Sequence, residues 1–134
     1  MASALSAILT QLATDIETTS ITKCYIGNAG SSTITPRAEL YLGTGEITDY
    51  LTNVQDRTIP FMVLVVGKSQ EVTEVALAEL IALWRNTAKL AALRALNVTT
   101  IYATTPASAQ IFAGSVPHQP VVADIEFTMT VRYS

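Results

Sequence analysis

The fold is decided by the stretch at residues 121–134, which reads Val-Val-Ala-Asp-Ile-Glu-Phe-Thr-Met-Thr-Val-Arg-Tyr-Ser. From Val121 to Tyr133 every second residue is apolar. Because successive side chains of a strand point to opposite faces, this alternation predicts one long strand with a buried and a wet face. At about 3.3 Å per residue the strand would span about 40 Å, roughly twice the usual length. A compact domain of this size needs no such length, so we expect part of the strand to serve an assembly.

The composition fits a single folded domain. Of the 134 residues, 49% are apolar and only 14% are charged, whereas about 25% are charged in typical proteins. The chain is too apolar for disorder, and its longest apolar run, at 59–67, contains Pro60 and is too short to span a bilayer. No basic segment precedes the first apolar residues, so we expect no secretory signal. The single Cys24 excludes an internal disulfide framework and is expected to be a core residue on a strand.

The charge distribution argues for protein partners rather than for nucleic-acid binding. A net charge of −3 does not provide a basic surface for nucleic acid. The only basic cluster is Arg85, Lys89 and Arg94, near the end of an expected helix, where cations complement the helix dipole. Residues 95–123 carry no charge at all. A surface so short of charge is hard to keep soluble and monomeric, so we expect partners to cover part of it.

The first half of the chain predicts a helix followed by strands. Ser3 is expected to cap a helix that ends near Thr18. Strands are expected at 21–26 and 34–42, joined as a hairpin by the turn residues between them, and Pro36 indicates that the second one begins at a sheet edge. Residues 43–57 fit either a two-turn helix or an extended excursion.

The second half predicts the major helix and the rest of the sheet. Residues 59–66 form a continuous apolar run typical of a fully buried strand. Ser69 is expected to cap the major helix, whose apolar positions wrap most of the way round it, so both of its faces should be covered. Asn86-Thr87 should interrupt the helix, and a strand at 98–103 and a long loop at 104–120 should follow. We therefore expect one α+β domain over residues 1–134, with a mostly antiparallel sheet, an N-terminal helix, one major helix and a long C-terminal strand.

Few residues suggest catalysis or ligand binding. Residues 66–69, Val-Gly-Lys-Ser, are similar to the end of a phosphate-binding loop, but that loop requires a glycine at the position of Met62. His118 is the only histidine, so a metal site or a catalytic triad would lack partners. Asp124 and Glu126 share a strand face, which alternation alone explains. We expect no catalytic residue, no metal, no cofactor and no enzymatic activity.

The loop at 104–120 carries the clearer interaction signal. Loops of this length in compact domains are usually functional or disordered. Ile111 and Phe112 are large and apolar, in a segment otherwise made mostly of small and polar residues. Two readings stay open: the pair packs on its own core, or it anchors a neighbouring protein. Together with Val116, these are the candidate protein-interface residues.

A resemblance to a known family covers nearly the whole chain. It rests on the N-terminal helix, on Pro-Phe-Met-Val-Leu-Val-Val at 60–66 running into the helix at 71–84, and on Leu-Asn-Val-Thr-Thr-Ile at 96–101. The long loop and the terminal strand Asp-Ile-Glu-Phe-Thr-Met-Thr-Val at 124–131 complete it. In this order the chain resembles the tail terminator (tail completion) proteins of long-tailed bacteriophages. That resemblance implies a ring, expected to be a hexamer, at the head-proximal end of the tail tube, which stops tube polymerisation and joins the tail to the head connector.

The resemblance also implies the partners and the location. The tail tube protein and the head–tail connector would be the partners, DNA would pass through the lumen only as cargo, and no membrane or cofactor would be involved. The protein would be assembled in the host cytoplasm and reside in the neck region of the virion. Six subunits of net charge −3 would give a ring of about −18, which would let DNA slide without sticking. Alternatives are another neck or connector ring, the tail tube subunit, a small oligomeric enzyme with a shared site, or a cellular interaction module.

Overall fold

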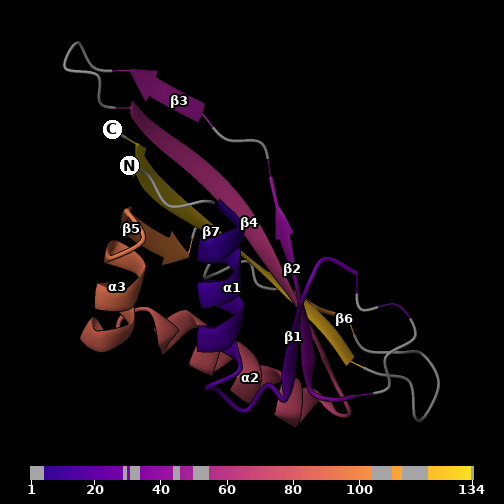
Figure 1. Ribbon diagram of the computed structural model, residues 1–134. Coiled ribbons are helices and arrows are strands. Elements are labelled where there is room, and N and C mark those ends of the chain that lie inside the picture. Colours follow the sequence, from indigo (N-terminus) through magenta and orange to yellow (C-terminus); the bar gives the residue numbers. More distant parts are fainter. Residues whose placement is uncertain are drawn as a thin grey trace.

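The computed structural model describes residues 5–28, 30, 34–43, 46–49, 55–103, 110–112 and 121–133, without the side chains of 46–49, 110–112 and 133. The elements in chain order are α1 (Leu5–Ile16), β1 (Lys23–Ile26), β2 (Arg37–Leu42), β3 (Glu46–Asp49), β4 (Gln55–Gly67), α2 (Gln70–Leu83), α3 (Thr87–Arg94), β5 (Val98–Ala103), β6 (Gln110–Phe112) and β7 (Val121–Tyr133). The strands form one sheet in the order β1-β2-β4-β7-β5, with β3 beside β4 and β6 beside β7 (Figure 1). Only β1 and β2 pair in parallel, so the expected α+β fold with a mostly antiparallel sheet is confirmed.

Two long strands, β4 and β7, form the spine of this sheet. Each has 13 residues, and they pair along their whole length, from Gln55↔Tyr133 to Gly67↔Val121. On its other edge β7 pairs with β5 and β6, so it lies inside the sheet. The length of β7 is thus matched within the subunit, because β4 begins earlier than the apolar run suggested and pairs with β7 residue for residue. That part of the strand serves an assembly stays a prediction.

The pairing of β1 with β2 is parallel, in the register Cys24↔Ala38, so the expected hairpin is wrong. For two consecutive strands to be parallel, the chain between them must run back to the end of the sheet at which the first strand began. Residues 27–36 form this connection between β1 and β2. Gly27 has a φ of +92°, a conformation that favours glycine, where the chain turns away from β1. Pro36 comes just before β2, which lies between β1 and β4 and not at an edge of the sheet.

The excursion at 43–57 is extended, because β3 pairs with the first residues of β4 in an antiparallel arrangement. Pro60 lies within β4, opposite the break between β2 and β3, and its C=O accepts the Gly43 N–H at 2.8 Å. In an antiparallel strand the N and C=O of one residue point to the same side, so the proton-free nitrogen of Pro60 faces that break and interrupts no ladder. A Cβ at Gly43 would lie 2.9 Å from Pro60 Cγ, which explains the glycine there.

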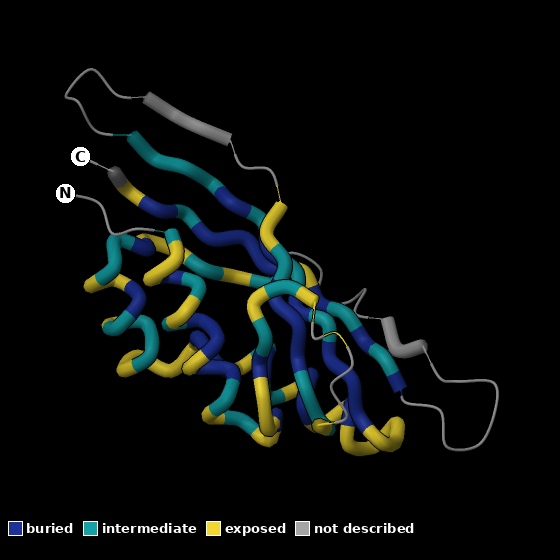
Figure 2. The backbone as a smooth tube through the Cα atoms, turned by 45° about the vertical axis from the view of Figure 1, so that its right-hand side comes forward, coloured by how far each residue is buried: buried dark blue, intermediate teal, exposed yellow. Residues whose placement is uncertain are grey.

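The three described helices pack on one face of the sheet, which we call the helix-side face (Figure 2). The core there joins odd-numbered positions of β4 and β7 to helix residues, among them Phe61, Val63, Ile125, Phe127, Ile8, Leu12, Leu80, Trp84 and Leu93. The rings of Phe61 and Phe127 stack with centroids 5.2 Å apart, and Trp84 meets them edge-on at 6.0 and 5.1 Å. The predicted apolar face of β7 is thus confirmed as the centre of the core.

Polar contacts also fix the helices. Asp15 of α1, only 4% exposed, accepts the indole N–H of Trp84 at 3.1 Å and the side-chain N–H of Gln11 at 2.9 Å. Glu79 of α2 accepts the backbone N–H of Ser20 at 2.8 Å. Because a buried carboxylate without donors is costly, these bonds specify how α1 sits against α2.

The predicted helix boundaries are confirmed where the structure describes them. The Ser69 hydroxyl accepts the N–H of Val72 and caps α2, and the Asn86 side chain accepts the N–H of Ala88 and caps α3. The expectation that α2 is covered on both faces is wrong within this subunit, because Val72 and Val75 are 37% and 48% exposed. The proposed cap Ser3 lies outside the described residues.

Candidate interaction surface

The phosphate-loop residues have structural roles. Met62 lies in β4, and the exposed Lys68 lies in the turn that leads to α2. A Cβ at Gly67 would collide with the Oγ1 of Thr73, so this glycine allows α2 to pack closely on the end of β4. The Thr73 hydroxyl, in turn, donates to the C=O of Ser69 at 2.9 Å.

Cys24 occupies the expected buried strand position. Burial, reinforced by Glu17 and opposed by Lys23, raises the pKa of its thiol to about 12, so the reactive thiolate does not form near neutral pH. His118 lies outside the described residues. Among the residues the structure describes, no His, Cys, Asp and Glu side chains gather in a group that could hold a metal ion. None of the described helices is long and apolar enough to cross a membrane.

The candidate residues of the long loop are only partly located. Residues 110–112 form β6, in which Ile111 pairs with Ala123 and Phe112 with Val122. The loop therefore adds a short strand to the edge of β7 that the sequence pattern did not predict. Val116 and the side chains of Ile111 and Phe112 lie outside the described part of the structure, so both readings of this pair stay predictions.

The other face of the sheet, which we call the open face, is not covered by any described helix. It consists of the even-numbered positions of β4 and β7 and their cross-strand partners. In register, the central rows across the strands are Tyr25, Glu39, Leu64 and Asp124, then Tyr41, Met62 and Glu126, then Pro60, Thr128 and Tyr102. Residues 59–66 of β4 are therefore apolar on both faces of the sheet, although the helices cover only the helix-side face.

Six apolar and aromatic residues in these rows form what we call the aromatic belt: Tyr25, Tyr41, Pro60, Met62, Leu64 and Tyr102. Tyr102 is 54% exposed and the other five are partly exposed. Thr128, expected on an ordinary wet surface, is instead buried, because Pro60 and Tyr102 flank it on the neighbouring strands. Tyrosine and methionine are enriched in protein interfaces, so the belt has the composition of a contact surface.

A hollow of about 400 Å³ opens where β2 ends and β4 continues, lined in part by Tyr41, Pro60, Met62 and Glu126. Beside it the Tyr41 hydroxyl donates to the Glu39 carboxylate. That hydrogen bond raises the pKa of the Tyr41 phenol, because the phenol loses it on ionising. The hollow gives the belt a recess into which a partner's side chain could insert.

Charged groups lie on both sides of the molecule. Glu39, Asp124 and Glu126 lie among the belt residues on the open face. On the helix side, residues 84–94 include Arg85, Lys89 and Arg94, which we call the basic cluster, and none of the chain's 11 acidic residues. As expected, Arg94 lies in the last turn of α3, where its positive charge complements the helix dipole.

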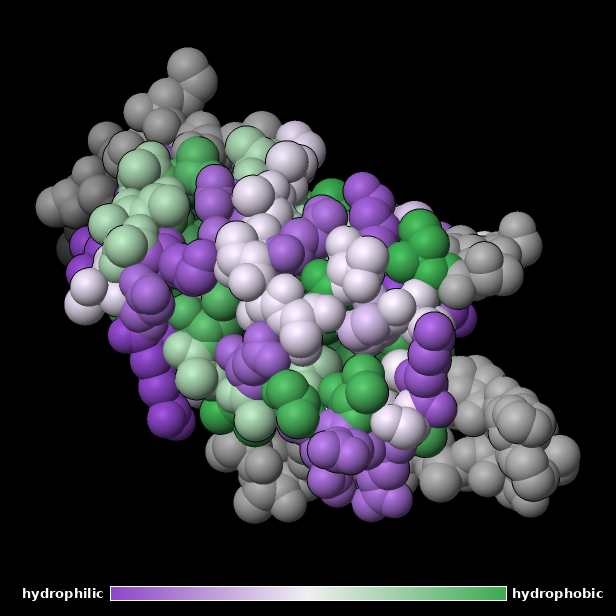
Figure 3. Space-filling view, turned by 90° about the horizontal axis from the view of Figure 1, so that it is seen from below, coloured by the Kyte–Doolittle hydropathy of each residue, from purple (hydrophilic) through white to green (hydrophobic). Residues whose placement is uncertain are grey.

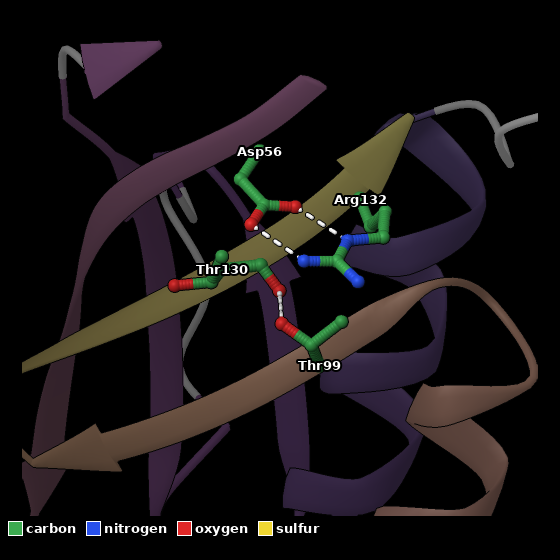
Figure 4. Close-up of polar contacts among 4 residues, drawn as sticks. All are labelled: Asp56, Thr99, Thr130 and Arg132. Atoms are coloured by element: carbon green, nitrogen blue, oxygen red, sulfur yellow. Dashed lines mark hydrogen bonds and ion pairs between the residues drawn. The ribbon is translucent and has the colours of Figure 1, made fainter. Parts of the chain in front are cut away.

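An ion pair lies at one end of the open face (Figure 4). Arg132 donates to the Asp56 carboxylate through Nε at 2.8 Å and Nη2 at 2.9 Å, across β7 and β4. The Thr99 hydroxyl donates to the C=O of Thr130 at 3.2 Å, beside an irregularity in β5. The cation of Arg132 is thus already neutralised on the face to which it belongs.

The surface at the α2 end of the molecule is mixed in character. Seen from below, hydrophobic side chains there are interspersed with hydrophilic ones (Figure 3). The exposed Val72 and Val75 lie on α2, where Glu71 and Glu74 are also exposed. The belt residues, by contrast, lie in adjacent rows of one sheet face, and we take this face as the candidate for a contact with another protein.

A scan against protein-family models finds no matching family, and a search of curated proteins finds no match.

Proposed function

We propose that this chain is a subunit of a closed ring at the head-proximal end of a phage tail tube, where it ends tube polymerisation and joins the tail to the head connector. The observation that carries the proposal is the open face, on which a strand apolar on both sides presents an aromatic belt that no described helix covers. Monomers rarely expose large continuous apolar surfaces, and those that are exposed usually mark contacts with other proteins.

The charge of the chain supports a ring through which DNA passes. The subunit carries −3, so a hexamer would carry about −18 and would repel the DNA backbone rather than hold it. A subunit with two different contact surfaces forms head-to-tail interfaces, which close into a ring when the rotation between neighbours permits. The resemblance to tail terminators noted from the sequence is the reason for placing this ring on a phage tail.

Electron microscopy of the purified protein, alone and mixed with tail tubes of its phage, tests this proposal. We expect closed rings, either free or seated on one end of the tubes, and tubes that stop growing once a ring is bound. Open-ended tubes made by the protein itself would instead identify a tube subunit. Rings that bind the connector but not the tube would identify another neck ring. A monomer that leaves tube growth unchanged would contradict every ring assignment.

A further inference from the structure

We infer that the aromatic belt of one copy receives the basic cluster, Arg85, Lys89 and Arg94, of the next copy in the ring. The inference rests on the proposed ring and adds which two surfaces meet in it. The occupant of the belt is therefore a second copy of this chain, presented by the end of its α2 and by its α3.

The chemistry of the belt selects a cationic partner. Asp124 is half-buried and Glu126 is exposed, and neither has an ion-pair or hydrogen-bond partner among the described residues. A partner that covers the apolar belt also removes water from these carboxylates. Without cations on that partner, the desolvated charges would oppose binding, whereas Arg and Lys side chains would satisfy them.

The basic cluster supplies that chemistry. Arg85 and Arg94 are exposed and form no ion pair with a described residue. Ala88 and Ala91 between them are also exposed, and their small side chains let a partner approach the helix closely. Arginine is favoured in interfaces because its planar guanidinium stacks on tyrosine rings and forms bidentate hydrogen bonds with carboxylates. The open face offers both tyrosines and carboxylates.

Three of the five other cations are less suitable. Lys23 lies 3.9 Å from Glu17, and Arg132 is held by Asp56. Arg37 pairs in register with Val66 and so belongs to the open face itself. The basic cluster, within residues 84–94, is the densest group of positive charge in the sequence.

The positions of the two surfaces favour a contact between copies. Leu93 of α3 packs in the core on the helix-side face, whereas the belt lies on the open face. The sheet therefore separates α3, with Lys89 and Arg94, from the belt residues of β1, β2 and β4 (Figure 2), whereas Arg85 lines a hollow together with Tyr102 at the β5 edge. A contact between two such different surfaces is head-to-tail, which is the type that generates rings.

Charge reversal on each surface tests the pairing. The belt variant carries Asp124→Lys and Glu126→Lys, and the cluster variant carries Arg85→Glu and Lys89→Glu. We expect each variant alone to fold, to melt as the wild type does, and to lose rings, with subunit affinity at least about tenfold weaker. Mixed in equal amounts, the two variants should form rings again, because opposite charges then face each other at every interface of an alternating ring.

Two controls complete the test, by sedimentation and microscopy, or on tail tubes if rings form only there. The variant Glu71→Lys, Glu74→Lys changes the charge equally on α2, away from the belt, and should keep its rings. Wild-type rings should form more slowly and weaken as salt is raised to about 0.5 M, since salt screens the attraction between the two oppositely charged surfaces as they approach. Normal rings from the belt variant, or no recovery in the mixture, would overturn the pairing but leave the ring itself intact. Absence of wild-type rings, free and on tubes, would instead contradict the proposed function.

Discussion

The two faces of the sheet are built from the same strands for different purposes. On the helix-side face, Phe61 and Phe127 pack against Trp84, and the polar Asp15 finds its donors within the chain. On the open face, Tyr41 and Met62 remain partly exposed beside carboxylates. One face is complete within the subunit, whereas under our proposal a partner covers the other. Substitutions on the first should therefore lower the stability of the subunit, and those on the second should affect association.

The variant Phe127→Asp makes the sharpest distinction between the faces. It removes an aromatic ring from the core cluster and buries an unpaired carboxylate, so we expect a loss of more than about 4 kcal/mol and no folded subunit. The neighbouring variant Glu126→Ala, on the open face, should change stability by less than about 0.5 kcal/mol. Circular dichroism and urea unfolding measure both. Similar losses in the two variants would contradict the assignment of faces.

The next largest effect is expected from Asp15→Ala. It leaves the Trp84 indole N–H, which now donates to Asp15 at 3.1 Å, without its acceptor in the interior. An unsatisfied buried donor costs about 1–3 kcal/mol. The matched control is Thr14→Ala on the exposed side of the same helix, expected within about 0.5 kcal/mol of wild type. A cost for Asp15→Ala that persists unchanged in a Trp84→Phe background would show that the hydrogen bond is not its source.

Cys24 provides a pH-dependent test of the edge of the helix-side core. Its thiol has a pKa of about 12 when folded, against an ordinary value of 9.0, so the unfolded chain loses the proton first as pH rises. The raised value therefore lowers stability progressively above pH 9.0 and has no such effect below it. The stability difference between wild type and Cys24→Ala, measured by urea unfolding, should shrink as pH rises through this range. A constant difference would indicate that the thiol is solvated.

The smallest effect is expected at the charged pair on the open face. The Arg132 side chain is 52% exposed and that of Asp56 14%, so solvent screens their attraction. We expect Arg132→Gln to cost less than about 1 kcal/mol in urea unfolding, and less still at high salt. A cost that is larger and insensitive to salt would mean that this end of the open face is part of the subunit's own core.

Local signals in the sequence predicted the local structure. The alternation from Val121 assigned the buried face of β7, and Ser69 and Asn86 marked the starts of α2 and α3. These features depend on residues within a few positions of one another, so they can be recognised in the sequence without knowledge of the fold.

Features that depend on distant partners were missed. Turn residues after β1 suggested a hairpin, but the parallel pairing with β2 is decided by which strand completes the sheet and not by the turn. The polar residues at the start of β4 gave no apolar pattern, although they pair with β7. The aromatic belt likewise could not be found from sequence alone, because Tyr25, Tyr41 and Tyr102 come from three strands that only the sheet order brings together.

The central position of β7 has a consequence for how the chain is made. Every strand that pairs with β7 precedes it in the chain. Strands β4 and β7 can therefore begin to pair only after Val121, the partner of Gly67, has been synthesised. During synthesis β4 therefore leaves the ribosome well before β7, its main partner. In that interval the apolar residues 59–66 of β4 are exposed and one edge of the strand is unpaired. Such edges invite pairing with other nascent chains, and distant pairings form slowly. Translation speed and chaperone supply should therefore limit the yield of this protein more than the stability of its finished fold.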